Sequence, residues 1–159
     1  MLFGSVALYA QRTPAPKPGI RVYLDITAPA DIKDTIYSYI TRELRGLNDV
    51  VLATEKDVYP ITLEILVMPS KNKVGELRGY AISVAATRTR ICEVTKPNTT
   101  RLKVYSDLEM HTLYTGAPTD LRKLSEDIVT DLDTDVLAPF RKDRDAPTII
   151  DDILGNPPK

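Results

Sequence analysis

The chain has 159 residues, of which 43% are hydrophobic and 27% charged, an ordinary balance for one soluble globular domain with a buried core. Its 21 basic and 22 acidic residues leave a net charge of −1, which excludes the overall positive field that attracts nucleic acid or an anionic membrane. A single cysteine excludes an internal disulfide, and the aromatic content of 6%, with no tryptophan, offers little stacking surface for single-stranded nucleic acid.

The first nineteen residues differ from the rest of the chain. Residues 2–10 are uncharged and mostly apolar, and Pro14, Pro16 and Pro18 then alternate up to Gly19. This order is typical of the end of a secretory signal peptide followed by an extended tether. We therefore expect residues 1–19 to be a signal-peptide remnant and Pro-rich tether, and the protein to be exported, either periplasmic or secreted.

Two features of this segment leave an alternative open. No basic residue precedes the apolar stretch, which a start codon further upstream would explain. Val6, Leu8 and Ala10 also alternate with their neighbours, as in a strand that joins the edge of a sheet. The stretch is too short for a transmembrane helix, which takes about 20 apolar residues, so no transmembrane segment is expected.

The next elements are a strand, a helix and two further strands. Residues 20–26 alternate apolar and polar side chains, which predicts a half-buried strand. From residue 30 to 45 the period becomes helical, with Gly46 as the natural stop. Residues 50–52 and 61–68 are short apolar or alternating runs that predict the second and third strands.

The second half of the chain predicts a long hairpin and a closing helix. Residues 79–94 and 101–114 are extended stretches around strong turn residues, and Leu108 and Met110 are expected on one face. A helix is predicted from Pro118 to Leu137 and is expected to end at Pro139. Residues 142–159 form a charged tail, so residues 20–141 constitute the single predicted domain.

The element order β-α-β-β-β-β-α predicts an α+β two-layer sandwich. A mostly antiparallel sheet of four to five strands would bury the apolar stripes of two helices on one of its faces. Because the strands come largely in hairpins, a doubly wound nucleotide-binding sheet is not expected.

This order over residues 20–137 resembles the anticodon-binding-like domain at the N-terminus of periplasmic TolB proteins, and related small domains of bacterial envelope lipoproteins. The resemblance implies a domain that mediates protein contacts. No lipidation cysteine follows the N-terminal apolar stretch, so the lipoprotein form does not carry over.

Two charged clusters are candidate partner-binding sites. Arg88 and Arg90 share a strand face, and Arg101 and Lys103 follow on the partner strand, which predicts a basic patch at the hairpin tip. Such a patch would contact an acidic partner, or it would only protect an edge strand from pairing. The second cluster lies on the last helix at a spacing of four residues and would meet a basic partner, or form a solvated face. Its members are Asp127, Asp131 and Asp135.

Catalytic and metal-binding motifs are absent from the sequence. It contains no phosphate-binding glycine loop, no HExxH and no CxxC, and its single histidine cannot form a multi-histidine zinc site, so no metal and no cofactor are expected. His111 is interpreted as a solvent-facing strand residue; as a general base it would need Ser106 or Cys92 as the nucleophile. Cys92 itself is interpreted as buried, with an intermolecular disulfide as the alternative. The Asn98-Thr99-Thr100 sequence matches a glycosylation acceptor.

These observations lead to an expected function without catalysis. We expect an exported bacterial domain of the cell envelope that binds a protein or another envelope component, with no nucleic-acid partner. The alternative is a structural component of a phage or an oligomer, whose N-terminal arm and C-terminal tail contact neighbouring copies. A hydrolase is the third hypothesis. It ranks last because the sequence shows no nucleophile, base and orienting group together.

Overall fold

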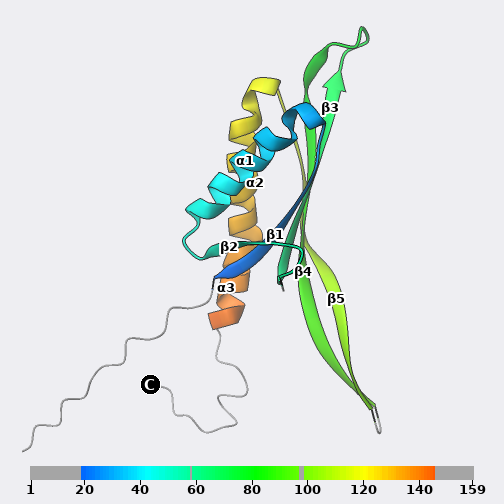
Figure 1. The fold of residues 1–159 in the computed structure, drawn as a ribbon, viewed down its shortest axis with the longest axis vertical. Helices are drawn as coiled ribbons and strands as arrows, with labels where there is room; N and C mark the ends of the chain where they lie inside the picture. Colours follow the sequence, from blue (N-terminus) through cyan, green and yellow to red (C-terminus); the bar gives the residue numbers. More distant parts are fainter. Residues whose placement is uncertain (1–18, 58, 97–98, 146–159) are drawn as a thin grey trace, which may run out of the picture.

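The computed structural model describes residues 19–57, 59–96 and 99–145, without the side chains of residues 91–102 and 145. One five-stranded sheet carries a layer of helices on one face (Figure 1). The elements in chain order are β1 (Ile20–Thr27), α1 (Ala30–Gly46), β2 (Val50–Ala53), β3 (Ile61–Lys71), β4 (Leu77–Lys96), β5 (Thr99–Gly116), η1 (Pro118–Asp120), α2 (Leu121–Leu132), η2 (Asp133–Leu137) and α3 (Ala138–Asp145).

The sheet confirms the predicted fold class. Its strand order is β2-β1-β3-β4-β5, and the two longest ladders, β3 with β4 and β4 with β5, are antiparallel. The strand β1 runs parallel to both of its neighbours, so the sheet is mixed at this end. The product is an α+β sandwich of two layers, with helices on one face only (Figure 1).

The core lies between the helices and the sheet. In α1 the buried positions recur every four residues at Ile32, Ile36, Ile40 and Leu44, as the helical period predicts. They meet alternate residues of the strands, such as Val22 and Leu63, both of which are fully buried. Burying a side chain of this size stabilises the fold by about 1.5–3 kcal/mol, so this shared layer is the main source of stability.

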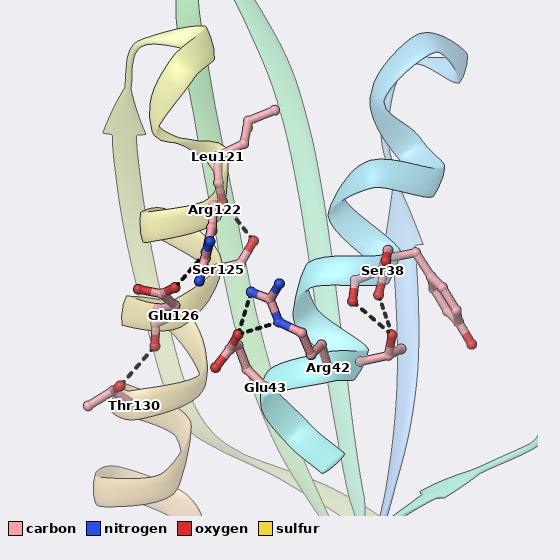
Figure 2. Close-up of polar contacts among 10 residues, drawn as sticks. Ser38, Arg42, Glu43, Leu121, Arg122, Ser125, Glu126 and Thr130 are labelled. Atoms are coloured by element: carbon pink, nitrogen blue, oxygen red, sulfur yellow. Dashed lines mark hydrogen bonds and ion pairs between the residues drawn. The ribbon is translucent and has the colours of Figure 1, made fainter. Parts of the chain in front are cut away.

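Two hydroxyl-bearing residues lie among these apolar helix positions. Thr41 and Ser125 are the buried polar residues of the core layer. Each hydroxyl donates a hydrogen bond of 2.8 Å to the carbonyl oxygen four residues earlier, those of Tyr37 and Leu121. Buried hydroxyls are therefore satisfied within their own helix. Figure 2 shows the same arrangement around them, since each polar contact drawn there stays within α1 or within α2.

The predicted end of the last helix is wrong. Instead of stopping at Pro139, the chain passes from α2 through the π-helical turn η2 into α3, which continues to Asp145. In that turn the amide of Ala138 donates to the carbonyl of Asp133, five residues earlier. Pro139 then lies in the first turn of α3, where its missing N–H and fixed φ are tolerated. The first residues of the predicted tail, Lys142–Asp145, therefore belong to a helix.

The hairpin of β4 and β5 is confirmed, but the expected faces along β5 are not. The register pairs Met110 with Ala86 and Leu108 with Thr87, so Glu109 is an extra residue in a β-bulge. The bulge places Leu108 and Met110 on opposite faces of the sheet. Met110 is buried under the helices, whereas Leu108 is 63% exposed.

Several predictions lie outside the described residues. They are the signal-peptide remnant and the alternative N-terminal strand, the turn around Asn98, and the tail beyond residue 145. The side chain of Cys92 is outside them as well, although its backbone pairs with Lys103 in the hairpin.

Candidate functional site

The second face of the sheet is not covered by any element that the structure describes. Between the flanking strands, β4 presents only small side chains to this side, at Ala81, Ser83 and Ala85. The neighbouring strands place larger apolar side chains around them, and each is exposed to an unusual degree. These side chains are Leu66 (42%), Met68 (45%), Leu108 (63%) and Leu113 (62%), and together with β4 they define what we call the uncovered face.

The register shows that these residues are neighbours. Leu66 of β3 lies opposite Ser83 of β4, and Ser83 lies opposite Leu113 of β5, so the two leucines flank one small residue in a single row. Met68 occupies the next row, opposite Ala81. An apolar row of this kind on an otherwise polar sheet face is a surface that can bury a partner.

Two carboxylates lie next to this apolar row. Asp25 of β1 is paired in register with Glu64 of β3, and both are exposed on the uncovered face. With Ser83 they line a depression of about 330 Å³. Like charges opposite each other weaken a sheet. Among the described residues no lysine or arginine pairs with either carboxylate, so the depression offers unpaired negative charge to a cation.

His111 lies at the other side of the same face. Its ring Nε2 is 3.2 Å from Oγ of Ser83, and the imidazole is exposed, as expected for a solvent-facing strand residue. The two nucleophiles proposed from the sequence are in the wrong place. The backbone of His111 pairs with Ala85 of β4. Cys92 lies seven residues further along β4, about 23 Å from Ala85. Ser106 pairs with Thr89, which lies about 13 Å from Ala85 along β4.

Ser83 and His111 have no third residue of a catalytic triad beside them among the described side chains. A serine nucleophile needs a base that is itself oriented by a third residue. Among the described residues no carboxylate is hydrogen-bonded to the second ring nitrogen of His111. The pair is therefore a polar contact on an exposed sheet face.

Arg88, Arg90 and Lys103 lie on the face of the hairpin toward the helices, but in different environments. Arg88 stacks 4.7 Å above the ring of Phe140 and forms a 2.8 Å ion pair with Asp143, so it joins the hairpin to α3. Arg90 pairs with Asp107 at 2.7 Å and with Glu109 at 3.4 Å.

The remaining two basic residues lie further along the hairpin. Lys103 is exposed and pairs in register with Cys92, whereas Arg101 pairs with Val94 and its side chain is outside the described set. Carboxylates thus neutralise the arginines nearest the body of the domain. Of the basic residues predicted at the hairpin tip, Lys103 is exposed and has no ion pair with a described carboxylate.

The acidic residues of the last helix are also engaged within the chain. Asp127 pairs with Lys123 at 3.1 Å, and Asp131 accepts a 2.5 Å hydrogen bond from the hydroxyl of Tyr114. Burial and this bond raise the pKa of Tyr114 well above its ordinary value of 10.0. Asp135 lies in η2 and is exposed. No group of three His, Cys, Asp or Glu side chains suited to a metal occurs in the described part of the chain.

One stabilising contact of the fold was not predicted from the sequence. Arg141 of α3 donates two 2.8 Å hydrogen bonds to the carboxylate of Asp49, in the turn before β2, and pairs with Asp133 at 2.7 Å. The hydrogen bonds from Arg141 hold the pKa of Asp49 below its ordinary value. The partners are 92 residues apart, so no local pattern announces the contact.

Comparisons with known proteins leave the family open. No family model matches the sequence, and no curated protein matches it. Among solved structures, one similar chain is that of a PelC dodecamer from Paraburkholderia phytofirmans. It is 16% identical over 76% of this chain and 90% of that chain, with a TM-score of 0.36. As for membranes, none of the helices within the described ranges is long and apolar enough to span a bilayer.

Proposed function

We propose that this chain is a non-catalytic binding module of the bacterial cell envelope, exported from the cytoplasm, which holds a protein partner on the uncovered face of its sheet. The observation that carries the proposal is the exposure of Leu66, Met68 and Leu113 on a face that no described element covers. The apolar row supplies binding free energy, at about 25 cal/mol for each Å² removed from water.

The chemistry of the partner follows from the charges beside the apolar row. Asp25 and Glu64 lie opposite each other without a described cation, and the leucine row begins one row further along the strands. A partner segment with a lysine or arginine next to apolar side chains would satisfy both features at once. Such a cation would relieve the repulsion between the two carboxylates, which gives specificity in addition to affinity.

The test is capture of the partner by the tagged full chain in its native cells, compared between surface variants. Leu66→Asp and Leu113→Asp are expected to reduce capture of the same partner at least tenfold, because each places a charge in the apolar row. Tyr37→Asp is the matched control, since Tyr37 is 49% exposed on α1, in the helix layer. Unchanged capture by both leucine variants, with folding verified by circular dichroism, would refute the proposal.

Charge and location are tested separately. Glu64→Lys is expected to weaken capture while Asp34→Lys, at an exposed position of α1, leaves it unchanged. N-terminal sequencing of protein from the native cell is expected to find a mature end at or near Gln11. An intact Met1 would contradict export without bearing on the binding face.

The second candidate function is a structural component of an assembly. It is favoured by one observation, the projection of the β4–β5 hairpin beyond the helices (Figure 1). In that case the domain would contact other copies of itself rather than a different protein.

A further inference from the structure

The distal half of the hairpin is a two-stranded arm. The ladder between β3 and β4 ends at Arg88, and the amide of Thr89 makes the last contact, with the carbonyl of Pro60. Beyond that point β4 pairs only with β5, and no described helix lies over it (Figure 1). Two-stranded hairpins are marginally stable by themselves in water. Pairing with a further strand would therefore stabilise this arm.

The outer edge of β5 is open along its 18 residues, since β4 is its single partner among the described strands. An open edge presents unpaired backbone N–H and C=O groups. Along the middle of this edge Val104 and Leu108 are 66% and 63% exposed, on the same side of the strand as Ser106. Lys103 precedes Val104, and Asp107 and Glu109 lie on either side of Leu108 in the sequence.

We propose that two copies of this chain pair through this edge, antiparallel, with the two-fold axis at Ser106. In this register Val104 of each copy faces Leu108 of the other, so the two most exposed apolar side chains of the edge cover each other twice. Lys103 faces Glu109 of the other copy, with Asp107 at the diagonal position. The paired segment, residues 103–109, spans about 24 Å and joins the two sheets into one.

The charge sequence selects this register. A shift of the axis by one residue, to Tyr105 or Asp107, places Val104 opposite Ser106 or opposite Met110, and the reciprocal Val104–Leu108 contacts are lost. Parallel pairing in register would stack Lys103 on Lys103 and Asp107 on Asp107, which places like charges side by side. Of these arrangements, the antiparallel one about Ser106 matches apolar to apolar and positive to negative. This inference does not rest on the proposed function, which depends on Leu66, Met68 and Leu113; Leu108 alone belongs both to the uncovered face and to the edge.

The experiment uses the full chain with Cys92→Ser as background and one new cysteine. Ser106→Cys places two thiols opposite each other on the axis, where Cα atoms in an antiparallel pair are about 4.5–5.5 Å apart, within the range for a disulfide. Mild oxidation is expected to convert most of the chain to a covalent dimer on a non-reducing gel. Thr115→Cys is the control: it is exposed on the same strand, nine residues from the axis, and is expected to remain monomeric.

A second measurement keeps the proposal testable without cysteines. Sedimentation equilibrium of the chain with its natural residues is expected to give a dimer, and Leu108→Lys is expected to weaken the dimer at least tenfold. A monomer at all concentrations, together with no trapping at Ser106→Cys, would overturn the proposal. A dimer that is trapped by Leu113→Cys rather than by Ser106→Cys would overturn it as well, because the second copy would then occupy the uncovered face.

The two proposals fail independently. Loss of trapping at Ser106→Cys with partner capture still sensitive to Leu66→Asp would remove the edge dimer and leave the binding face. Trapping at Ser106→Cys with partner capture unaffected by Leu66→Asp would remove the binding face and leave the edge dimer.

Discussion

Arg141 and Asp49 form a bidentate ion pair that joins the last helix to the turn between α1 and β2, with both N···O distances at 2.8 Å. The amide of Ile20 donates to the carbonyl of the same Asp49, so this one residue holds the beginning of β1 as well. The pair therefore fixes three elements that enter or leave the domain at one end.

Replacing the arginine is expected to destabilise the domain. Arg141→Gln removes two charge-assisted hydrogen bonds from Asp49, and we expect a loss of about 1–2 kcal/mol in the free energy of unfolding, reduced from the value for a buried pair because both side chains are partly exposed. Urea denaturation at pH 7 measures it. Arg122→Gln is the control, because its pair with Glu126 is an exposed contact within one helix, and its effect should be much smaller.

The same pair predicts a pH dependence. Because the pKa of Asp49 is lower in the folded chain than its ordinary 3.8, its contribution to stability is complete above that value and is lost as the pH falls through the folded pKa. The difference in stability between the natural chain and Arg141→Gln should thus be largest near neutral pH and shrink below about pH 4. A difference that stays constant down to pH 2 would contradict the assignment.

Close approach of backbone at one corner of the sheet predicts a second sensitive position. A Cβ at Gly79 would lie 2.3 Å from the carbonyl oxygen of Gly116, closer than any real Cβ contact, and backbone cannot move aside cheaply. Gly79→Ala is expected to cost about 1–3 kcal/mol, as for other forced contacts in a packed site. Gly46→Ala should be close to neutral, since beyond its chain neighbours and its own helix backbone nothing lies within 4 Å of that Cβ. Equal thermal midpoints for the two variants would be inconsistent with this packing.

The hydrogen bond from Tyr114 to Asp131 joins β5 to α2 across the core layer. Tyr114→Phe keeps the ring and removes the donor, so we expect a loss of about 1 kcal/mol in the free energy of unfolding. Tyr37→Phe serves as the comparison, because Tyr37 is 49% exposed. Guanidinium denaturation of both variants measures the two losses. A similar loss in both would indicate a general effect of removing a hydroxyl rather than the bond to Asp131.

Periodicity was sufficient for the elements that have one buried face. The four-residue spacing of Ile32, Ile36 and Ile40 and the alternation along β1 both arise from contact with a single core, so the sequence carries them directly. Leu108 shows the limit. A bulge at Glu109 shifts the phase of β5, and nothing in a list of alternating residues indicates where an extra residue is inserted.

The last helix and the site show two further limits. Pro139 is compatible with a helix because a π-turn precedes it, which depends on backbone geometry that no local rule predicts. The uncovered face could not be seen from the sequence because Leu66 and Leu113 look like ordinary strand residues. They become unusual only when the register places them together on the side that the helices leave open. The charged clusters, in contrast, were visible in the sequence, but their ion pairs within the chain were not.

Site-specific photo-crosslinking in the native cell shows directly whether the uncovered face contacts a partner protein. A photoreactive phenylalanine analogue is introduced at Leu113 on the uncovered face or, as the matched control, at Tyr37 on the helix layer. We expect a specific covalent adduct with a partner protein from Leu113, lost when Glu64→Lys is added, and no such adduct from Tyr37. Adducts from Tyr37 alone, or none from Leu113 in a correctly folded chain, would contradict it.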